Sequence, residues 1–265
     1  MGGTFRRAAL GLPLVATTGL AAMGAQAWYA GHRRLPRYRD LEIGGRFGPA
    51  EAPELRIAVL GDSTVSGTGL DDPGDLWLRR ALEPMTERYH LRVKSEAVSG
   101  ARARDVLMYQ VRAAVAWSPD VAVVSVGAND ALRRFRIAGF EHDLRAIVDA
   151  LRDCGSVVVL AGVGDVGAAP LLPFPLRMVV SERARAADRV HARIAAQSAA
   201  VSKIPVAEET TAIFRSRPDL FCGDLFHPNR HGHRVWAATA RPVLERAVVE
   251  RSQDATLPLR LRTVG

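Results

Sequence analysis

The chain has few cysteines and few aromatic residues, and both shortages narrow its possible functions. Its 265 residues include two cysteines, Cys154 and Cys222, which allow at most one disulfide. Nothing in the sequence shows that the two positions meet in space, so we expect both thiols to be unpaired. Aromatic residues make up 6% of the chain. They form no stripe among clustered basic residues, which argues against nucleic-acid binding.

The sequence also lacks any collagen, coiled-coil or repeat period. With 48% hydrophobic and 24% charged residues, its composition is that of a globular protein. The formal net charge is +8, but many of the arginines lie close to the two ends, at Arg6, Arg7, Arg260, Arg262 and between positions 33 and 39. Much of the basicity is therefore terminal and does not mark a binding face.

The first 31 residues are typical of a targeting segment. Arg6 and Arg7 precede an uncharged run from Ala8 to Gly31, a pattern that directs a chain to the membrane. Ala25-Gln26-Ala27 has the small-x-small form of a cleavage site, while the run is also long enough to remain as an anchor. Both outcomes predict an extracytoplasmic protein, either secreted or in contact with the membrane through residues 1–31. Residues 32–54 are expected to be a linker.

From Arg56 onward, short apolar runs alternate with longer segments of helical period. We predict strands at 56–60, 92–97, 120–126, 156–162 and 204–207, and helices near 75–88, 103–117, 139–153, 182–200 and 231–249. This alternation is typical of a parallel sheet covered by helices on both faces. The expected fold class is α/β, a three-layer α/β/α sandwich over residues 55–250, followed by a tail at 251–265.

Polar motifs follow three of the predicted strands. Gly61-Asp62-Ser63 comes after the first strand, Ser99-Gly100 after the second and Gly127-Ala128-Asn129-Asp130 after the third. Because ligands of doubly wound sheets bind beyond the carboxyl ends of the strands, we expect these motifs to converge on one edge.

Ser63 is the candidate nucleophile. A serine hydroxyl needs a base within hydrogen-bond reach and a third group that orients the base. Asp224-Leu225-Phe226-His227-Pro228 offers both, since a spacing of three lets a carboxylate and an imidazole emerge from one turn. The predicted catalytic residues are therefore Ser63, His227 and Asp224.

Acyl transfer also requires donors aimed at the oxygen on which negative charge develops. The Ser63 amide, the Gly100 amide and the Asn129 side chain are the candidates for this oxyanion hole. Asp62 and Asp130 are expected to support the surrounding loops.

These four blocks, in this order, resemble those of the SGNH subgroup of the GDSL esterase and lipase family. The resemblance runs from about Arg56 to about Val249. It implies a flavodoxin-like sandwich of five parallel strands, a triad of Ser63, His227 and Asp224, and an oxyanion hole of Ser63, Gly100 and Asn129. One departure is that many relatives carry Asn where this chain reads Glu96-Ala97-Val98-Ser99.

Each candidate also has a plainer interpretation. In this interpretation Ser63 caps a helix, Gly100 satisfies a turn, and Asn129 with Asp130 forms an Asx turn. A metal site built from Asp224 and three histidines lacks the HExxH pattern, so we predict no metal and no organic cofactor. The histidines concerned are His227, His231 and His233; the latter two are expected to open the last helix and face solvent.

Two further segments lie on the expected ligand edge. Gly164 to Val180 is rich in apolar residues and proline, and it either lines an acyl pocket or lid or forms an irregular connection. Arg133-Arg134-Phe135-Arg136 is either a solvated loop or an attractor of anionic substrates.

The sequence therefore predicts a monomeric serine hydrolase that acts on a small ester, thioester or lipid. Two alternatives stay open. One is an O-acyltransferase or deacetylase that acts on sugars or lipids of the cell envelope, and the other is a non-catalytic surface-binding module.

Overall fold

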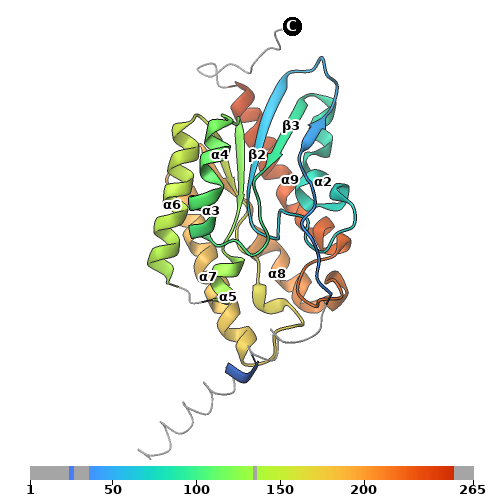
Figure 1. Ribbon diagram of the computed structural model, residues 1–265, viewed down its shortest axis with the longest axis vertical. Coiled ribbons are helices and arrows are strands. Elements are labelled where there is room, and N and C mark those ends of the chain that lie inside the picture. The colour runs from blue at the N-terminus through green and yellow to red at the C-terminus, as the bar shows by residue number, and fades with distance from the viewer. Residues whose placement is uncertain (1–23, 27–35, 134–135, 254–265) are drawn as a thin grey trace, which may run out of the picture.

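The computed structural model describes residues 24–26, 36–133 and 136–253, which form a mixed sheet between two layers of helices (Figure 1). The strands are β1 (Gly45–Phe47), β2 (Glu54–Gly61), β3 (His90–Ser95), β4 (Val121–Ser125), β5 (Val157–Leu160) and β6 (Val201–Lys203). Their order is β1-β3-β2-β4-β5-β6, with β1 antiparallel to β3 and all other neighbours parallel. The predicted three-layer α/β sandwich is confirmed, but the sheet has six strands rather than five.

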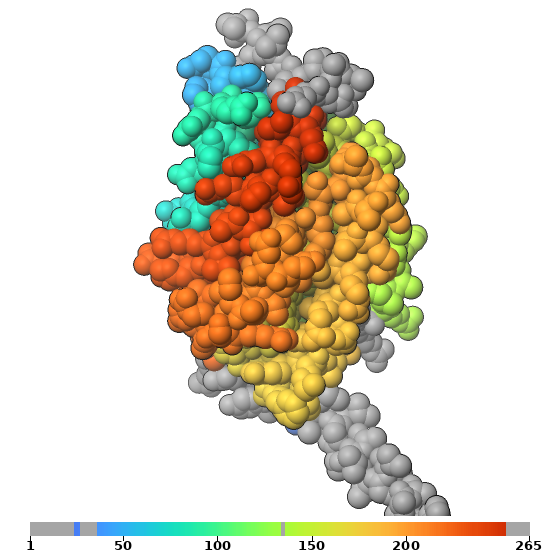
Figure 2. Space-filling model, turned by 180° about the vertical axis from the view of Figure 1, so that it is seen from behind, coloured from blue at the N-terminus to red at the C-terminus, as the bar shows by residue number. Residues whose placement is uncertain are grey.

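The helices divide between the two faces of the sheet. They are α2 (Trp77–Leu82), α3 (Ala103–Tyr109), α4 (Val111–Ala116), α5 (Ala128–Leu132), α6 (Ile137–Asp153), α7 (Leu176–Ala195), α8 (Val206–Ser216) and α9 (Arg230–Gln253). Helices α3, α4, α6 and α7 pack on one face, and α2 and α9 pack on the other. Figure 2, seen from behind, shows α9 in red beside the orange segment that precedes it.

The central strands are held by burial on both sides. In β2, Leu55, Ile57 and Val59 pack toward α2 and α9, while Ala58 and Leu60 pack toward the opposite layer. Each large aliphatic side chain buried in this way contributes about 1.5–3 kcal/mol. Because both faces are buried, residues 57–60 of this strand read as a continuous apolar run in the sequence.

The edges of the sheet differ from the sequence prediction. Strand β1 lies within the segment expected to be a linker, and nearby Ile43 is only 2% exposed in the core. The prediction of a strand at 204–207 is wrong, because β6 spans Val201–Lys203. Pro205 precedes helix α8, which was not predicted. Proline has no N–H for a sheet ladder and fits the start of a helix, so the apolar residues after it turn into α8.

The helices predicted at 139–153, 182–200 and 231–249 correspond to α6, α7 and α9, although α7 begins earlier, at Leu176. The helix predicted at 103–117 is divided into α3 and α4 at Gln110. The one predicted at 75–88 is α2 flanked by two 3₁₀ turns, Pro73–Asp75 and Glu83–Glu87.

The strand order fixes where a ligand can bind. Strand β3 lies on one side of β2 and β4 lies on the other, so the chain changes direction across the sheet between β2 and β4. Loops that leave the carboxyl ends of such strands diverge and open a crevice. Helix α5, which follows β4, lies below the sheet in Figure 1 and marks that end.

The predicted targeting segment, residues 1–31, lies outside the described residues except for a short helical piece at 24–26. Residues 254–265 of the predicted tail are likewise outside them. In the described ranges, no helix combines the length and the apolar character that a membrane crossing requires.

Candidate active site

Asp224 and His227 form a tightly bonded pair in the loop before α9. His227 Nδ1 lies 2.6 Å from Asp224 Oδ2, and the amides of Phe226 and His227 each donate to Asp224 Oδ1 at 2.9 Å. Burial by itself would raise the pKa of Asp224, but these bonds outweigh it and hold that pKa below its ordinary value. The carboxylate therefore stays charged and keeps the proton of a neutral imidazole on Nδ1, which leaves Nε2 as the basic nitrogen.

Ser63 lies at the turn that ends β2 and is 8% exposed. The turn passes through Gly61 at φ +146°, where a Cβ would collide with the Ser125 carbonyl oxygen of the neighbouring strand. The buried Gln110 side chain fixes this glycine from the other side: Gly61 N–H donates to Gln110 Oε1 at 2.8 Å, and Gln110 Nε2 donates to the Gly61 carbonyl at 2.9 Å. A glycine is required here because the backbones approach so closely.

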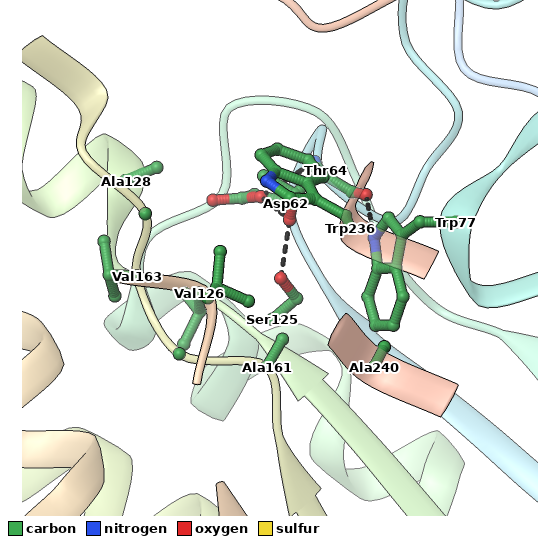
Figure 3. Close-up of a pocket in the computed structure, with 13 residues that line it drawn as sticks. Asp62, Thr64, Trp77, Ser125, Val126, Ala128, Ala161, Val163, Trp236 and Ala240 are labelled. Carbon is green, nitrogen blue, oxygen red and sulfur yellow. Dashed lines mark hydrogen bonds between the residues drawn. The ribbon is translucent and has the colours of Figure 1, made fainter. Parts of the chain in front are cut away.

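Thr64 ties the same turn to the neighbouring strand β4. Its hydroxyl lies 2.6 Å from Ser125 Oγ, and its carbonyl oxygen accepts a hydrogen bond from Trp77 Nε1 at 2.8 Å (Figure 3). These bonds fix the residue next to Ser63 from β4 and from α2. The position of the candidate nucleophile is therefore set by rigid elements.

Ser63, Asn129 and His227 line one cavity. The fold thus brings together residues separated by more than 160 positions in the chain. Ser63 and His227 both lie in the part of the chain that the structure describes, and no hydrogen bond joins Ser63 Oγ to His227 Nε2 there. Catalytic hydrogen bonds are often long in unliganded enzymes and shorten when substrate binds.

The three predicted oxyanion donors differ in availability. Among the described residues, neither the Ser63 N–H nor the Gly100 N–H has a hydrogen-bond acceptor, and Gly100, at φ +83°, faces open space. The Asn129 side chain donates to Asp62 Oδ2 at 3.1 Å and to the Ala101 carbonyl at 3.2 Å. Both of its protons are engaged, so Asn129 can serve a substrate only by sharing or giving up one of these bonds.

Asp62 and Asp130 lie behind the candidate nucleophile. Asp62 is fully buried and accepts hydrogen bonds from Thr64 and Asn129, yet burial outweighs these bonds and raises its pKa. Asp130 accepts from the Ala103 amide at 3.1 Å. Burial, reinforced by the nearby Asp62 charge, raises the pKa of Asp130 to about 6. Both carboxyl groups hold loops in place.

The expectation that His231 and His233 face solvent is wrong for His233. His231 is exposed, but the His233 side chain is 1% exposed and its Nδ1 accepts from the Trp77 amide at 3.3 Å. Burial, together with the proximity of His227, lowers the pKa of His233 to about 3. Within the part of the chain that the structure describes, no cluster of three or more His, Cys, Asp or Glu could hold a metal ion.

Asp40 is a supporting residue that the sequence did not indicate. Its Oδ1 accepts hydrogen bonds from Ser66 and Thr68 in the loop after Ser63, at 2.6 and 2.8 Å. Its Oδ2 accepts from the Ser99 amide, next to Gly100, at 2.9 Å. One carboxylate from the segment expected to be a linker therefore connects the loop of the nucleophile with the loop of an oxyanion donor.

The segment from Gly164 to Val180 divides into two parts. Gly164, Asp165, Val166 and Ala169 line the cavity, which favours the pocket interpretation for the first part. The second part enters α7 at Leu176. In the predicted basic loop, Arg133 and Arg136 are exposed, and residues 134–135 lie outside the described ranges.

Cys154 and Cys222 are both free thiols, as expected. Cys222 Sγ lies 3.1 Å from the carbonyl oxygen of Gly69 and 3.3 Å from that of Pro228, and these two oxygens share its one proton. Burial, with the nearby charges of Asp224 and Asp71, raises the pKa of this thiol to about 12. Such a thiol is not a nucleophile, because the reactive form is the thiolate.

A family model described as the GDSL-like lipase/acylhydrolase family matches residues 59–235, more than half of the chain. The chain belongs to this family. The match begins within β2, just before Ser63, and ends within α9, so it includes Gly100, Asn129 and the Asp224–His227 pair.

One curated protein and two solved structures are similar to this chain. A protein described as a GDSL-like esterase from Mycobacterium tuberculosis is 28% identical over 204 residues, which cover 75% of this chain and 64% of that protein. The crystal structure of TesA matches with a TM-score of 0.57 at 23% identity, over 72% of this chain and 99% of TesA. The esterase EstA from Pseudoalteromonas sp. matches with a TM-score of 0.57 at 17% identity, over 73% and 98% of the two chains. These two structures share the fold of this member of the GDSL family.

Proposed function

We propose that this GDSL family member is a serine hydrolase that cleaves carboxylic esters or thioesters through a triad of Ser63, His227 and Asp224. The observation that carries the proposal is the position of Ser63 in the same cavity as His227, whose Nδ1 lies 2.6 Å from a charged carboxylate. This arrangement provides a nucleophile, a base and a group that orients the base.

In the proposed reaction, His227 Nε2 takes the proton of Ser63 Oγ while Oγ attacks the carbonyl carbon of the substrate. The amides of Ser63 and Gly100 donate to the oxyanion, and Asn129 joins them by sharing one of its protons. His227 then protonates the departing alcohol or thiol, which leaves an acyl-serine. The same histidine deprotonates a water that attacks this ester, and the acid is released from Ser63.

The cavity also bears on the substrate. Apart from the catalytic groups, its lining includes the side chains of Val166, Phe214, Phe221 and Phe226. An apolar lining with a few convergent polar groups is typical of small-molecule sites. We therefore assign the cavity to the acyl group of the substrate and expect activity toward short or medium acyl chains.

A panel of p-nitrophenyl esters from acetate to laurate tests the proposal, with wild type compared with Ser63→Ala and His227→Ala. We expect turnover by wild type and a loss of about 10⁴-fold or more in each variant. Chelator should leave the wild-type rate unchanged. A Ser63→Ala variant as active as wild type would remove the proposal.

The covalent intermediate has a separate test. An alkyl phosphonate p-nitrophenyl ester should add one phosphonyl group to wild type, located on the peptide that contains Ser63, and none to Ser63→Ala. Mass spectrometry measures both outcomes. Release of free acid with and without a sugar or lipid alcohol separates hydrolysis from acyl transfer to an acceptor, because a transferase would release less acid when acceptor is present.

We also propose that the protein acts outside the cytoplasmic membrane, which rests on the composition of residues 1–31. Fusion of residues 1–54 to a reporter that is active only after export should give activity. Fusion of a variant with Leu10, Leu12 and Leu14 replaced by Asp should not.

A further inference from the structure

Two neighbouring cavities lie at the carboxyl end of the sheet. The outer cavity contains Ser63 and His227 and has a volume of about 80 Å³. The inner cavity has about 40 Å³ and is bordered by Ser125 and Ala161 at the ends of β4 and β5 and by Ala240 of α9 (Figure 3). The inner one contacts neither Ser63 nor His227, so it has no part in the proposed chemistry.

The two cavities share a wall of four residues, which are Thr64, Ala128, Gly164 and Trp236. Glycine has no side chain, alanine has one methyl group, and the Thr64 hydroxyl is bonded to Asp62 and Ser125. Trp236 is the one large side chain in this wall. Figure 3 shows its indole at the same end of the inner cavity as Asp62 and Thr64.

Packing holds the indole of Trp236 in this position. Its ring centroid lies 5.5 Å from that of Phe214 and 5.5 Å from that of His233. Its Nε1 is buried and forms no hydrogen bond with another described residue. In this wall the indole therefore acts through its bulk, which separates the two cavities.

We propose that Trp236 sets the upper limit of acyl chain length, because an acyl chain in the outer cavity ends against its indole. This inference rests on the proposed esterase function. The inner cavity continues beyond the indole, and most of its border is apolar, including Val126, Val163 and Ala240. A longer acyl chain could enter that space only after the indole is removed.

The test compares Trp236→Ala with wild type on p-nitrophenyl esters of increasing acyl length. In the variant, we expect the ratio of kcat/KM for decanoate to that for butyrate to rise at least about tenfold, since each newly buried methylene favours binding by about fourfold. The change should appear mainly in KM. If Trp236→Ala does not fold, as judged by circular dichroism, Trp236→Leu opens the same wall with a smaller loss of packing.

Two matched variants test whether the change in chain-length preference comes from the opened wall or from a general loosening of the packing. Trp236→Phe keeps a ring in the wall and should retain the wild-type chain-length profile. Ala240 lies one helical turn from Trp236 on α9, and it borders the inner cavity but not the outer one. The double variant with Trp236→Ala and Ala240→Leu should therefore refill the inner cavity and return the decanoate-to-butyrate ratio toward the wild-type value.

A second readout does not depend on turnover. The rate at which butyl and decyl phosphonate p-nitrophenyl esters inactivate the enzyme should shift in favour of the decyl compound in Trp236→Ala. An active Trp236→Ala with the wild-type profile, or a shift seen only when the alcohol part of the ester is lengthened, would overturn the assignment of Trp236. Neither result affects the triad, whereas retained turnover in Ser63→Ala removes the proposed function itself.

Discussion

The two sides of the candidate active site use carboxyl groups in opposite ways. On the histidine side, Asp224 receives three hydrogen bonds and its pKa lies below the ordinary value, so it remains charged beside His227. On the serine side, burial raises the pKa of Asp62 and Asp130. Asp62 also receives three hydrogen bonds, from the Thr64 amide, the Thr64 hydroxyl and Asn129, but it is 0% exposed whereas Asp224 is 7% exposed. The comparison teaches that the depth of burial, and not the number of donors, decides whether such a carboxyl keeps its charge.

The largest expected effect comes from removing the charge on the histidine side. Asp224→Asn leaves the size of the side chain almost unchanged but withdraws the acceptor that orients His227, so kcat should fall by about 10²- to 10⁴-fold. Steady-state kinetics measures the loss. Asp219→Asn is the matched control, because Asp219 is exposed in the same region and pairs with Arg217; its kcat should match that of wild type. Equal activities of the two variants would contradict the comparison.

A smaller effect is expected on the serine side from Asp62→Asn. Asp62 accepts from Thr64 through one oxygen and from Asn129 through the other. In either orientation of the new amide, its NH₂ group therefore faces a donor of Thr64 or of Asn129. We expect a loss of about 1–3 kcal/mol in the free energy of unfolding and a fall in kcat of about 10- to 100-fold. Urea unfolding and kinetics measure these changes. A variant with wild-type stability would show that Asp62 does not organise the loop.

The pH dependence of stability tests the same difference between the carboxyl groups on the two sides of the site. The pKa of Asp130 is about 6 in the folded protein, above its ordinary value of 3.8, so the folded state holds this proton more tightly than the unfolded state. Its contribution to stability is therefore complete below about pH 4 and is lost as the pH rises through about 6.

Asp130→Asn cannot titrate and should gain about 1–2 kcal/mol over wild type between pH 4 and pH 7, after allowance for the partial exposure of the carboxyl. Thermal unfolding at several pH values measures this gain. The exposed Asp149→Asn is the control and should show no such trend. A constant difference between Asp130→Asn and wild type over this pH range would mean that Asp130 titrates normally.

The smallest effect is expected at Cys222, which bonds to the backbone on both sides of the site. Since burial raises the pKa of this thiol to about 12, iodoacetamide should modify it very slowly at pH 8, and Cys222→Ala should change kcat/KM by less than about twofold. Cys154→Ala provides the comparison. Rapid alkylation of Cys222 with loss of activity would show that the thiol is more exposed to reaction than its burial implies.

The centre of the fold was predictable from the sequence because its strands are buried on both faces. Residues 57–60 of β2 and 121–124 of β4 read as apolar runs, and the polar motifs follow soon after them. The edges were not predictable, because the three residues Gly45–Phe47 have no pattern of their own and gain their partners only from β3. Helix α8 had a signal that was missed, the spacing of its buried residues Val206, Thr210 and Phe214.

The candidate site shows the same division. Ser63, Asp224 and His227 could be named from motifs, because the chemistry demands these residue types. The contacts of Gln110 with Gly61 and of Trp236 with both cavities depend on how distant elements pack, and no local pattern encodes them. The sequence therefore indicated the candidate residues, while their supports and the shape of the cavity required the structure.

The contacts of Asp40 affect where this protein can be shortened. A truncation planned from the sequence alone would start near residue 55, at the first long strand, and would discard Asp40, Ile43 and strand β1 together. The loops of Ser63 and Gly100 would then lose their common acceptor, although every residue of the proposed triad would still be present. A shortened version of the enzyme should therefore begin before Asp40, so that these hydrogen bonds are kept.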